Sequence, residues 1–157
     1  MEVKFTKSAQ AEFQKIAGKY PEKRAALLPV LHLAQREFGW ISREVMRYLS
    51  ELLEIPVTEV LDTATFYTMF KTRPSGKYHI QICGTLSCAL RGSRQVYEHL
   101  VDKLKIKEGE VTADGKFSLL KVECLGSCGT APVVQINDDY YEDVSIEKLD
   151  KILADLK

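Results

Sequence analysis

The chain has 157 residues, and its 22 lysine and arginine side chains are balanced by 22 aspartate and glutamate side chains. This length is enough for one medium domain, or for two small domains that each bury an apolar core. So even a charge balance is not typical of a nucleic-acid-binding protein, and we expect no nucleic-acid partner. No stretch approaches the roughly 20 apolar residues of a membrane span, and the opening MEVKFTKSAQ lacks the apolar segment of a secretory signal, which favours a cytoplasmic location.

Residues 1–74 are predicted to form a helical domain, because apolar residues recur at helical spacing along this half. Four helices are expected, at residues 8–20, 21–39, 41–54 and 57–70. Pro29 lies inside the second stretch and predicts a kink or a break, since proline lacks a backbone donor. Ser42 and Thr58 are the expected N-caps of the third and fourth helices. The polar, turn-rich stretch KTRPSGK then predicts a linker.

The spacing changes at Tyr78, and residues 75–157 are predicted to form an α/β domain with a small mixed sheet. Strands are expected at KYHIQIC, FSLLKVEC, PVVQI and YYEDV, and helices at SRQVYEHLVDKLK and SIEKLDKILADLK. Ser93 is the expected N-cap of the first of these helices. A right-handed strand–helix–strand connection makes the first two strands parallel neighbours. The expected fold class is therefore α+β, a helical bundle followed by an α/β domain.

All four cysteines lie in two short stretches, CGTLSC and CLGSC. Each stretch follows the end of a predicted strand, and the carboxyl ends of neighbouring parallel strands meet at one edge of a sheet. We therefore expect the pair Cys83 and Cys88 to face the pair Cys124 and Cys128. In a reducing compartment, clustered cysteines indicate metal binding or redox chemistry rather than a structural disulfide framework.

Three kinds of site use paired cysteines. A disulfide-exchange site requires a gap of two residues at a helix start, and neither pair has that spacing. Zinc accepts four thiolates, although short gaps dominate in its sites, whereas an iron–sulfur cluster also accepts longer chelate loops. The spacing favours an iron–sulfur cluster and leaves zinc open. Gly84 and Gly126 are expected to take positive φ angles and turn backbone N–H groups toward the site.

Four stretches together carry a family resemblance: ICGTLSCALRGS, ECLGSCGTAPVVQIN, LPVLHLAQREFGWIS and TATFYTMF. With them the chain resembles, over nearly its whole length, the two-iron ferredoxin-like subunit of respiratory NADH:quinone oxidoreductase (complex I). The resemblance implies that residues 75–157 have a thioredoxin-like fold and hold one 2Fe–2S cluster. The four ligand positions of the family match Cys83, Cys88, Cys124 and Cys128.

The same resemblance implies an electron-transfer subunit that exchanges single electrons with a flavin on a partner subunit. FMN and NADH are expected on that partner, which leaves this chain without catalytic residues and inactive when isolated. The absence of a G-x-G-x-x-G or P-loop motif agrees with this expectation. The subunit is expected in the peripheral part of a membrane-associated complex, with no direct membrane contact.

Two alternatives remain open at this point. Related subunits occur in NAD-linked hydrogenases and formate dehydrogenases, and the sequence does not separate these from complex I. A zinc-stabilised binding module is the other candidate. The three histidines, His32, His79 and His99, are not spaced as ligand pairs, and we expect ordinary structural or surface roles for them.

Overall fold

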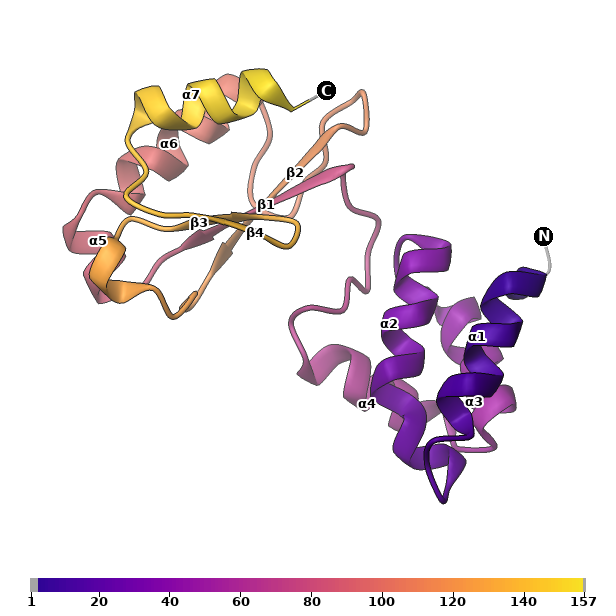
Figure 1. The fold of residues 1–157 in the computed structure, drawn as a ribbon. Helices are drawn as coiled ribbons and strands as arrows, with labels where there is room; N and C mark the ends of the chain where they lie inside the picture. The colour runs from indigo at the N-terminus through magenta and orange to yellow at the C-terminus, as the bar shows by residue number, and fades with distance from the viewer. Residues whose placement is uncertain (1–2, 157) are drawn as a thin grey trace. The chain divides into compact units, whose positions relative to one another are not determined.

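The computed structural model describes residues 3–156, and the chain divides into two compact units, Met1–Pro74 and Ser75–Lys157 (Figure 1). The apolar cores of the two units share no residue. That the two units are independent domains stays a prediction. The predicted α+β class is confirmed, because the first unit is helical and the second contains a four-stranded sheet.

The first unit consists of helices joined by short turns. Its elements are α1 (Lys7–Ala17), the 3-10 helix η1 (Lys23–Ala26), α2 (Leu27–Phe38), α3 (Arg43–Leu53) and α4 (Val57–Phe66). The side chains that fill its centre are fully buried: Val30, Leu31, Ile41, Leu49, Leu53 and Val60. The apolar periodicity therefore located all four expected helices.

The expected start of the second helix and the expected N-cap of the fourth are wrong. Pro29 is the third residue of α2, because η1 takes up the residues before it. A proline in the first turn removes an N–H that has no helical partner, so no kink is required. Thr58 does not cap α4: the helix begins at Val57, as expected, but its N-cap is Pro56. Ser42 does cap α3, accepting a hydrogen bond from the Val45 N–H at 3.2 Å.

The second unit is built on a mixed sheet with the strand order β2-β1-β3-β4. The strands are β1 (Tyr78–Cys83), β2 (Phe117–Val122), β3 (Val134–Ile136) and β4 (Asp139–Tyr141). β1 and β2 are parallel, as predicted, whereas β3 is antiparallel to both β1 and β4. Figure 1 shows α6 (Ser93–Leu104) and α7 (Ile146–Asp155) side by side on one face of this sheet. Their inward side chains complete the core with those of β1 and β2: Ile80, Ile82, Val96, Leu100, Leu119 and Leu149.

Two short features of the second unit differ from expectation. A helix of five residues, α5 (Leu86–Leu90), was not predicted. Ser93 does not cap α6 but is its first residue, and the N-cap is Gly92 with φ +99°. Glycine suits this position because an L side chain rarely adopts such a φ. α5 carries Cys88, and Gly92 follows two residues after α5 ends, so both features determine the path of the chain around the first cysteine pair.

Within residues 3–156, no helix combines the length and the apolar character needed to cross a membrane.

Candidate metal centre

The two cysteine-bearing segments leave the sheet at the same end. β1 and β2 run parallel with Cys83 opposite Val122 in the register, so the segments that follow both strands begin at one edge. The first segment forms α5, which carries Cys88, and the second runs through Cys124 to the 3-10 helix η2 (Cys128–Thr130). α5 contacts η2 directly. The parallel pairing of two strands thus brings residues far apart in the sequence to one small region.

Cys83 is the last residue of β1 and is only 2% exposed. Its sulfur lies 3.2 Å from the Thr85 hydroxyl oxygen. Burial raises the pKa of this thiol, but hydrogen bonds from the Thr85 hydroxyl, the N–H groups of Thr85 and Leu125 and the Cys88 thiol outweigh burial and lower the pKa to about 7. A thiol that ionises this readily is suited to bind a metal, because the thiolate is the ligand.

Cys88 lies within α5 and is as buried as Cys83. Burial and a hydrogen bond to the Cys83 sulfur raise its pKa, and the charges of Cys83 and Cys128 raise it further. The N–H of Val133 acts in the opposite direction and lowers it. Cys88 therefore lies within electrostatic range of both Cys83 and Cys128. Four ionised thiols here would repel strongly, so a cation is needed to hold them all ionised.

The second pair, Cys124 and Cys128, lies on the surface, and all four thiols are free. The Gly126 N–H donates to the Cys124 sulfur at 3.3 Å, and Gly126 has φ +81°. The expected inward N–H is therefore confirmed at Gly126. At Gly84 the expectation is wrong, because the Gly84 N–H donates to the Val122 carbonyl oxygen at 2.8 Å, within the pairing of β1 with β2.

The four thiols lie at one edge of the sheet but do not form a complete coordination site. Within residues 3–156, no three histidine, cysteine, aspartate or glutamate side chains lie close enough together to hold a metal ion. One pair is buried and the other lies on an exposed turn. The donor set nevertheless fits an iron–sulfur cluster, which takes four thiolates. Backbone N–H groups already point at the sulfurs of Cys83, Cys88 and Cys124, and such donors offset the negative charge of a bound cluster.

The histidines hold other positions. His79 Nδ1 lies 2.8 Å from the Ser118 hydroxyl oxygen, between β1 and β2. His99 Nε2 lies 2.7 Å from Asp150 Oδ1, between α6 and α7. The third, His32, packs against the Phe70 ring with 4.9 Å between the ring centroids. All three have structural contacts, as the sequence indicated.

Sequence reasoning missed the residues that surround the thiols. Thr85, Leu125 and Val133 all donate hydrogen bonds to cysteine sulfurs. For Thr85 a signal existed, because threonine is a favoured N-cap residue and Thr85 is the N-cap of α5. For Leu125 and Val133 the donor is the backbone N–H, which carries no sequence signature.

Comparisons with known proteins agree with this geometry. A family model described as thioredoxin-like [2Fe-2S] ferredoxin matches residues 13–157. The E subunit of the NADH-quinone oxidoreductase of Rickettsia bellii is 49% identical over 156 residues, which cover 98% of this chain and 93% of that protein. The second subunit of the NADH-quinone oxidoreductase of Thermus thermophilus is 47% identical over 143 residues, which cover 89% of this chain and 79% of that protein.

A solved structure resembles the chain at the level of the fold. The air-oxidized NAD+-reducing [NiFe]-hydrogenase superposes with a TM-score of 0.73 and 25% sequence identity. The match covers 83% of this chain but only 22% of the hydrogenase chain, so this chain corresponds to about a fifth of that protein.

Proposed function

Because the chain belongs to the thioredoxin-like [2Fe-2S] ferredoxin family, we propose that it is the electron-transfer subunit of NADH:quinone oxidoreductase that carries one 2Fe–2S cluster. The observation that carries this function is the arrangement of four free cysteines after two neighbouring parallel strands. Relatives named as subunits of NADH-quinone oxidoreductase share about half of their residues with the chain over nearly its full length. The chain is therefore a subunit of an oxidoreductase complex.

The ligands of the cluster are proposed to be Cys83, Cys88, Cys124 and Cys128. Cys83 and Cys88 form one short chelate loop and would bind one iron, and Cys124 and Cys128 would bind the other. Support comes from the α5–η2 contact and from the N–H groups directed at three of the four sulfurs. When bound, the cluster takes up and releases one electron at a time. The chain's own residues orient the sulfurs and neutralise part of their charge.

Analysis of iron and acid-labile sulfide tests the cofactor. Two irons and two sulfides per chain are expected, together with a visible absorption band that bleaches when dithionite is added. A colourless protein with one zinc per chain would refute the proposal, since zinc also accepts four thiolates.

The partner that exchanges electrons with the cluster is proposed to be a flavin- and NADH-binding subunit, docked against the cysteine edge. α5 supports this placement, because its Leu86 and Leu90 are 73% and 78% exposed beside the buried Cys88. Two exposed leucines one helical turn apart are typical of a contact surface. Replacing both by aspartate, Leu86→Asp and Leu90→Asp, should abolish co-purification with the flavin subunit while leaving the iron content unchanged. Retained co-purification would exclude this face of α5.

A hydrogenase subunit is the second candidate function. The fold similarity to the NAD+-reducing hydrogenase favours it, but the match has 25% identity against 49% for the oxidoreductase relative. Purification of the native assembly separates the two candidates: quinone reduction by NADH is expected, and hydrogen uptake coupled to NAD+ would support the second. A peripheral place in a membrane-associated assembly belongs to the same proposal, tested by release of the chain with its flavin partner on salt treatment of membranes.

A further inference from the structure

The turn that carries Cys128 is held by a residue far from the cysteines in the sequence. Glu142 follows β4, and its Oε1 atom accepts hydrogen bonds from the hydroxyls of Ser127 and Thr130. The Thr130 bond is 2.8 Å long. Ser127 precedes Cys128 directly and Thr130 ends the short helix η2 that Cys128 begins. A single carboxylate oxygen therefore binds the turn on both sides of one cysteine.

Backbone hydrogen bonds reinforce this connection. The Asp143 N–H donates to the Thr130 carbonyl oxygen at 2.6 Å, and the Val144 N–H donates to the Pro132 carbonyl oxygen at 3.0 Å. The segment around Glu142 thus runs alongside the turn and is joined to it by side-chain and by backbone hydrogen bonds. Small relative movements of the two segments would break side-chain and backbone contacts together.

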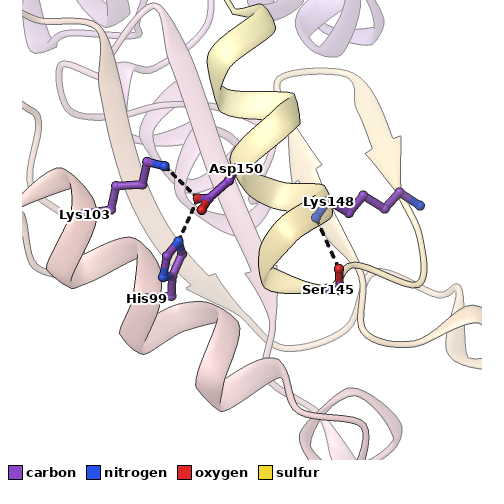
Figure 2. A network of polar contacts seen from close by, with 5 residues as sticks. All are labelled: His99, Lys103, Ser145, Lys148 and Asp150. Atoms are coloured by element: carbon purple, nitrogen blue, oxygen red, sulfur yellow. Dashed lines mark hydrogen bonds and ion pairs between the residues drawn. The ribbon is translucent and has the colours of Figure 1, made fainter.

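Glu142 itself is held in place by a hydrogen bond from α7. Lys148, in the first turn of α7, donates from Nζ to the Glu142 carbonyl oxygen at 2.6 Å. The Ser145 hydroxyl accepts from the Lys148 N–H at 3.2 Å and caps the same helix (Figure 2). α7 in turn packs on the sheet core through Leu149 and Leu153, which are buried. The carboxylate therefore extends from a well-packed element.

The turn has few apolar contacts to fix it. Cys124, Cys128, Gly129 and Thr130 are all exposed, and the apolar neighbours of the cysteine edge lie on the buried side, at Ala131 and Val133. An exposed turn with few apolar contacts takes its conformation from its hydrogen bonds. Ser127 and Thr130 bond to each other within the turn, and Glu142 is the side chain from outside the turn to which both hydroxyls donate.

We propose that Glu142 is a positioning residue for the cluster: by binding Ser127 and Thr130 it fixes the turn so that the Cys128 sulfur is presented to the iron. That the Cys128 sulfur binds iron rests on the proposed function. The hydrogen bonds from Ser127 and Thr130 to Glu142 do not depend on that function. The tether needs an acceptor oxygen at the Oε1 position and not a negative charge. A glutamine keeps that oxygen, whereas an alanine removes it.

The experiment compares Glu142→Ala, Glu142→Gln and the wild type as full chains with cluster bound. In Glu142→Ala the cluster should be lost to a chelator about ten times faster, the usual scale for removing a hydrogen-bond partner that supports a metal ligand. Its reduced-state EPR spectrum should broaden, because the turn then samples several conformations. Glu142→Gln should restore both the retention and the line width. Asp139→Asn, an exposed carboxylate of β4, is the control and should behave as the wild type.

Two results would overturn the positioning role. One is a Glu142→Ala chain with wild-type cluster retention and an unchanged EPR spectrum. The other is a Glu142→Gln chain as defective as Glu142→Ala, since the tether would then not depend on the acceptor oxygen.

A second measurement separates this role from the proposed function. In metal-free protein, hydrogen exchange at the Thr130 and Asp143 amides should accelerate in Glu142→Ala and not in Glu142→Gln. This result is expected whichever metal the cysteines bind, and unchanged exchange in Glu142→Ala would overturn the tether by itself. A wild-type chain that binds zinc would overturn the proposed cofactor alone.

Discussion

The four cysteines lie in two different environments. Cys83 and Cys88 are each 2% exposed and interact with backbone N–H groups, whereas Cys124 and Cys128 sit on an exposed turn. The buried pair is fixed by the sheet and by α5, because Cys83 ends β1 and Cys88 lies within α5. The exposed pair depends on the local hydrogen bonds of its turn. Loss of a ligand from the exposed turn should therefore remove the cluster without disturbing the core.

Cys124→Ala tests this difference at the level of one residue. The iron content should fall by at least about tenfold, because an iron that keeps one protein ligand of two is readily lost. Circular dichroism of the variant should match that of the metal-free wild type. His99→Ala is the control, since His99 contacts Asp150 and not the thiols, and it should keep full iron content. Equal iron loss in both variants would contradict the assignment of Cys124 as a ligand.

The residues of the candidate site were only partly predictable from the sequence. The four cysteines were found because cysteine is rare in this chain and their gaps are short. Glu142 was not found, because it lies in another segment of the sequence and reaches Ser127 and Thr130, which flank Cys128, only when β4 folds beside β3. The inward N–H was predicted at two glycines but is present at Gly126 only. At Gly84 the strand pairing takes the N–H, and strand ends are hard to locate to one residue from sequence.

At the scale of elements, α6 and α7 are joined by one carboxylate. Asp150 Oδ1 lies 2.7 Å from His99 Nε2 and 2.7 Å from Lys103 Nζ (Figure 2). Hydrogen bonds from Lys103 and His99 lower the pKa of Asp150 below its usual value. Two partners from successive turns of α6 therefore fix the position of α7 along it.

Asp150→Asn should make the second unit less stable at neutral pH, with the difference from wild type depending on pH. Because the folded-state pKa is lowered, the ionised carboxylate stabilises the fold at pH values above the unfolded-state pKa, near 3.8. This stabilisation is lost as the pH falls below that value and through the lower folded-state pKa. Urea unfolding of both proteins between pH 7 and pH 3 measures it. If the difference in unfolding free energy between wild type and Asp150→Asn grew as the pH fell below 3.8, the ionised carboxylate would not be the stabilising form.

The N-terminus of α7 offers a second test at this scale. The Ser145 hydroxyl accepts a hydrogen bond from the Lys148 N–H, so Ser145→Ala leaves that donor without its cap. The expected cost is about 1 kcal/mol of unfolding free energy, the typical value for loss of an N-cap. Ser145→Asp is the matched control and should retain most of the stability, because aspartate is an equally good cap. Urea denaturation at pH 7 compares the three proteins.

The elements that were predicted and those that were missed differ in length. The helices with several turns of apolar periodicity, and both parallel strands, were located by that periodicity. α5 has five residues, too few to show a helical period, and it was missed. The expected N-caps of α4 and α6 were wrong because Pro56 and Gly92 occupy the cap positions through their backbone angles, without a side-chain acceptor. Caps of that kind leave a weaker signal than serine or threonine.

At the scale of the whole chain, each unit buries an apolar core of its own. One core contains residues from Phe5 to Phe70 and the other contains residues from Ile80 to Leu153. All four cysteines belong to the second unit. Binding of a metal should therefore stabilise one unit directly, and the other only if the two fold together.

Removing the metal tests the independence of the units. Hydrogen exchange in the metal-free protein should accelerate strongly in residues 75–157, above all near the cysteines, because the free energy of metal binding that joins the two cysteine segments is then lost. Residues 1–74 should keep the exchange rates of the metal-loaded protein. Acceleration to the same extent in both units would show that they fold as one cooperative body.

The isolated chain should oxidise no NADH. Hydride chemistry requires a bound nicotinamide and an acceptor such as flavin, and the sequence contains no dinucleotide-binding motif for either. Purified chain with its cluster should give an NADH–ferricyanide rate equal to that of the metal-free chain. A rate that rises in proportion to cluster content would contradict the assignment of NADH and FMN to the partner subunit.

The position of the linker between the two cores has a consequence for genetic recombination. The boundary between the two units falls inside the linker, residues 71–77, because the first unit ends at Pro74 and the second begins at Ser75. A genetic crossover within this segment would exchange one intact core for another and split neither. If the two units fold independently, as the hydrogen-exchange experiment tests, substitutions in different halves should have additive effects on stability. Independence of this kind would let selection act on each half of the gene separately.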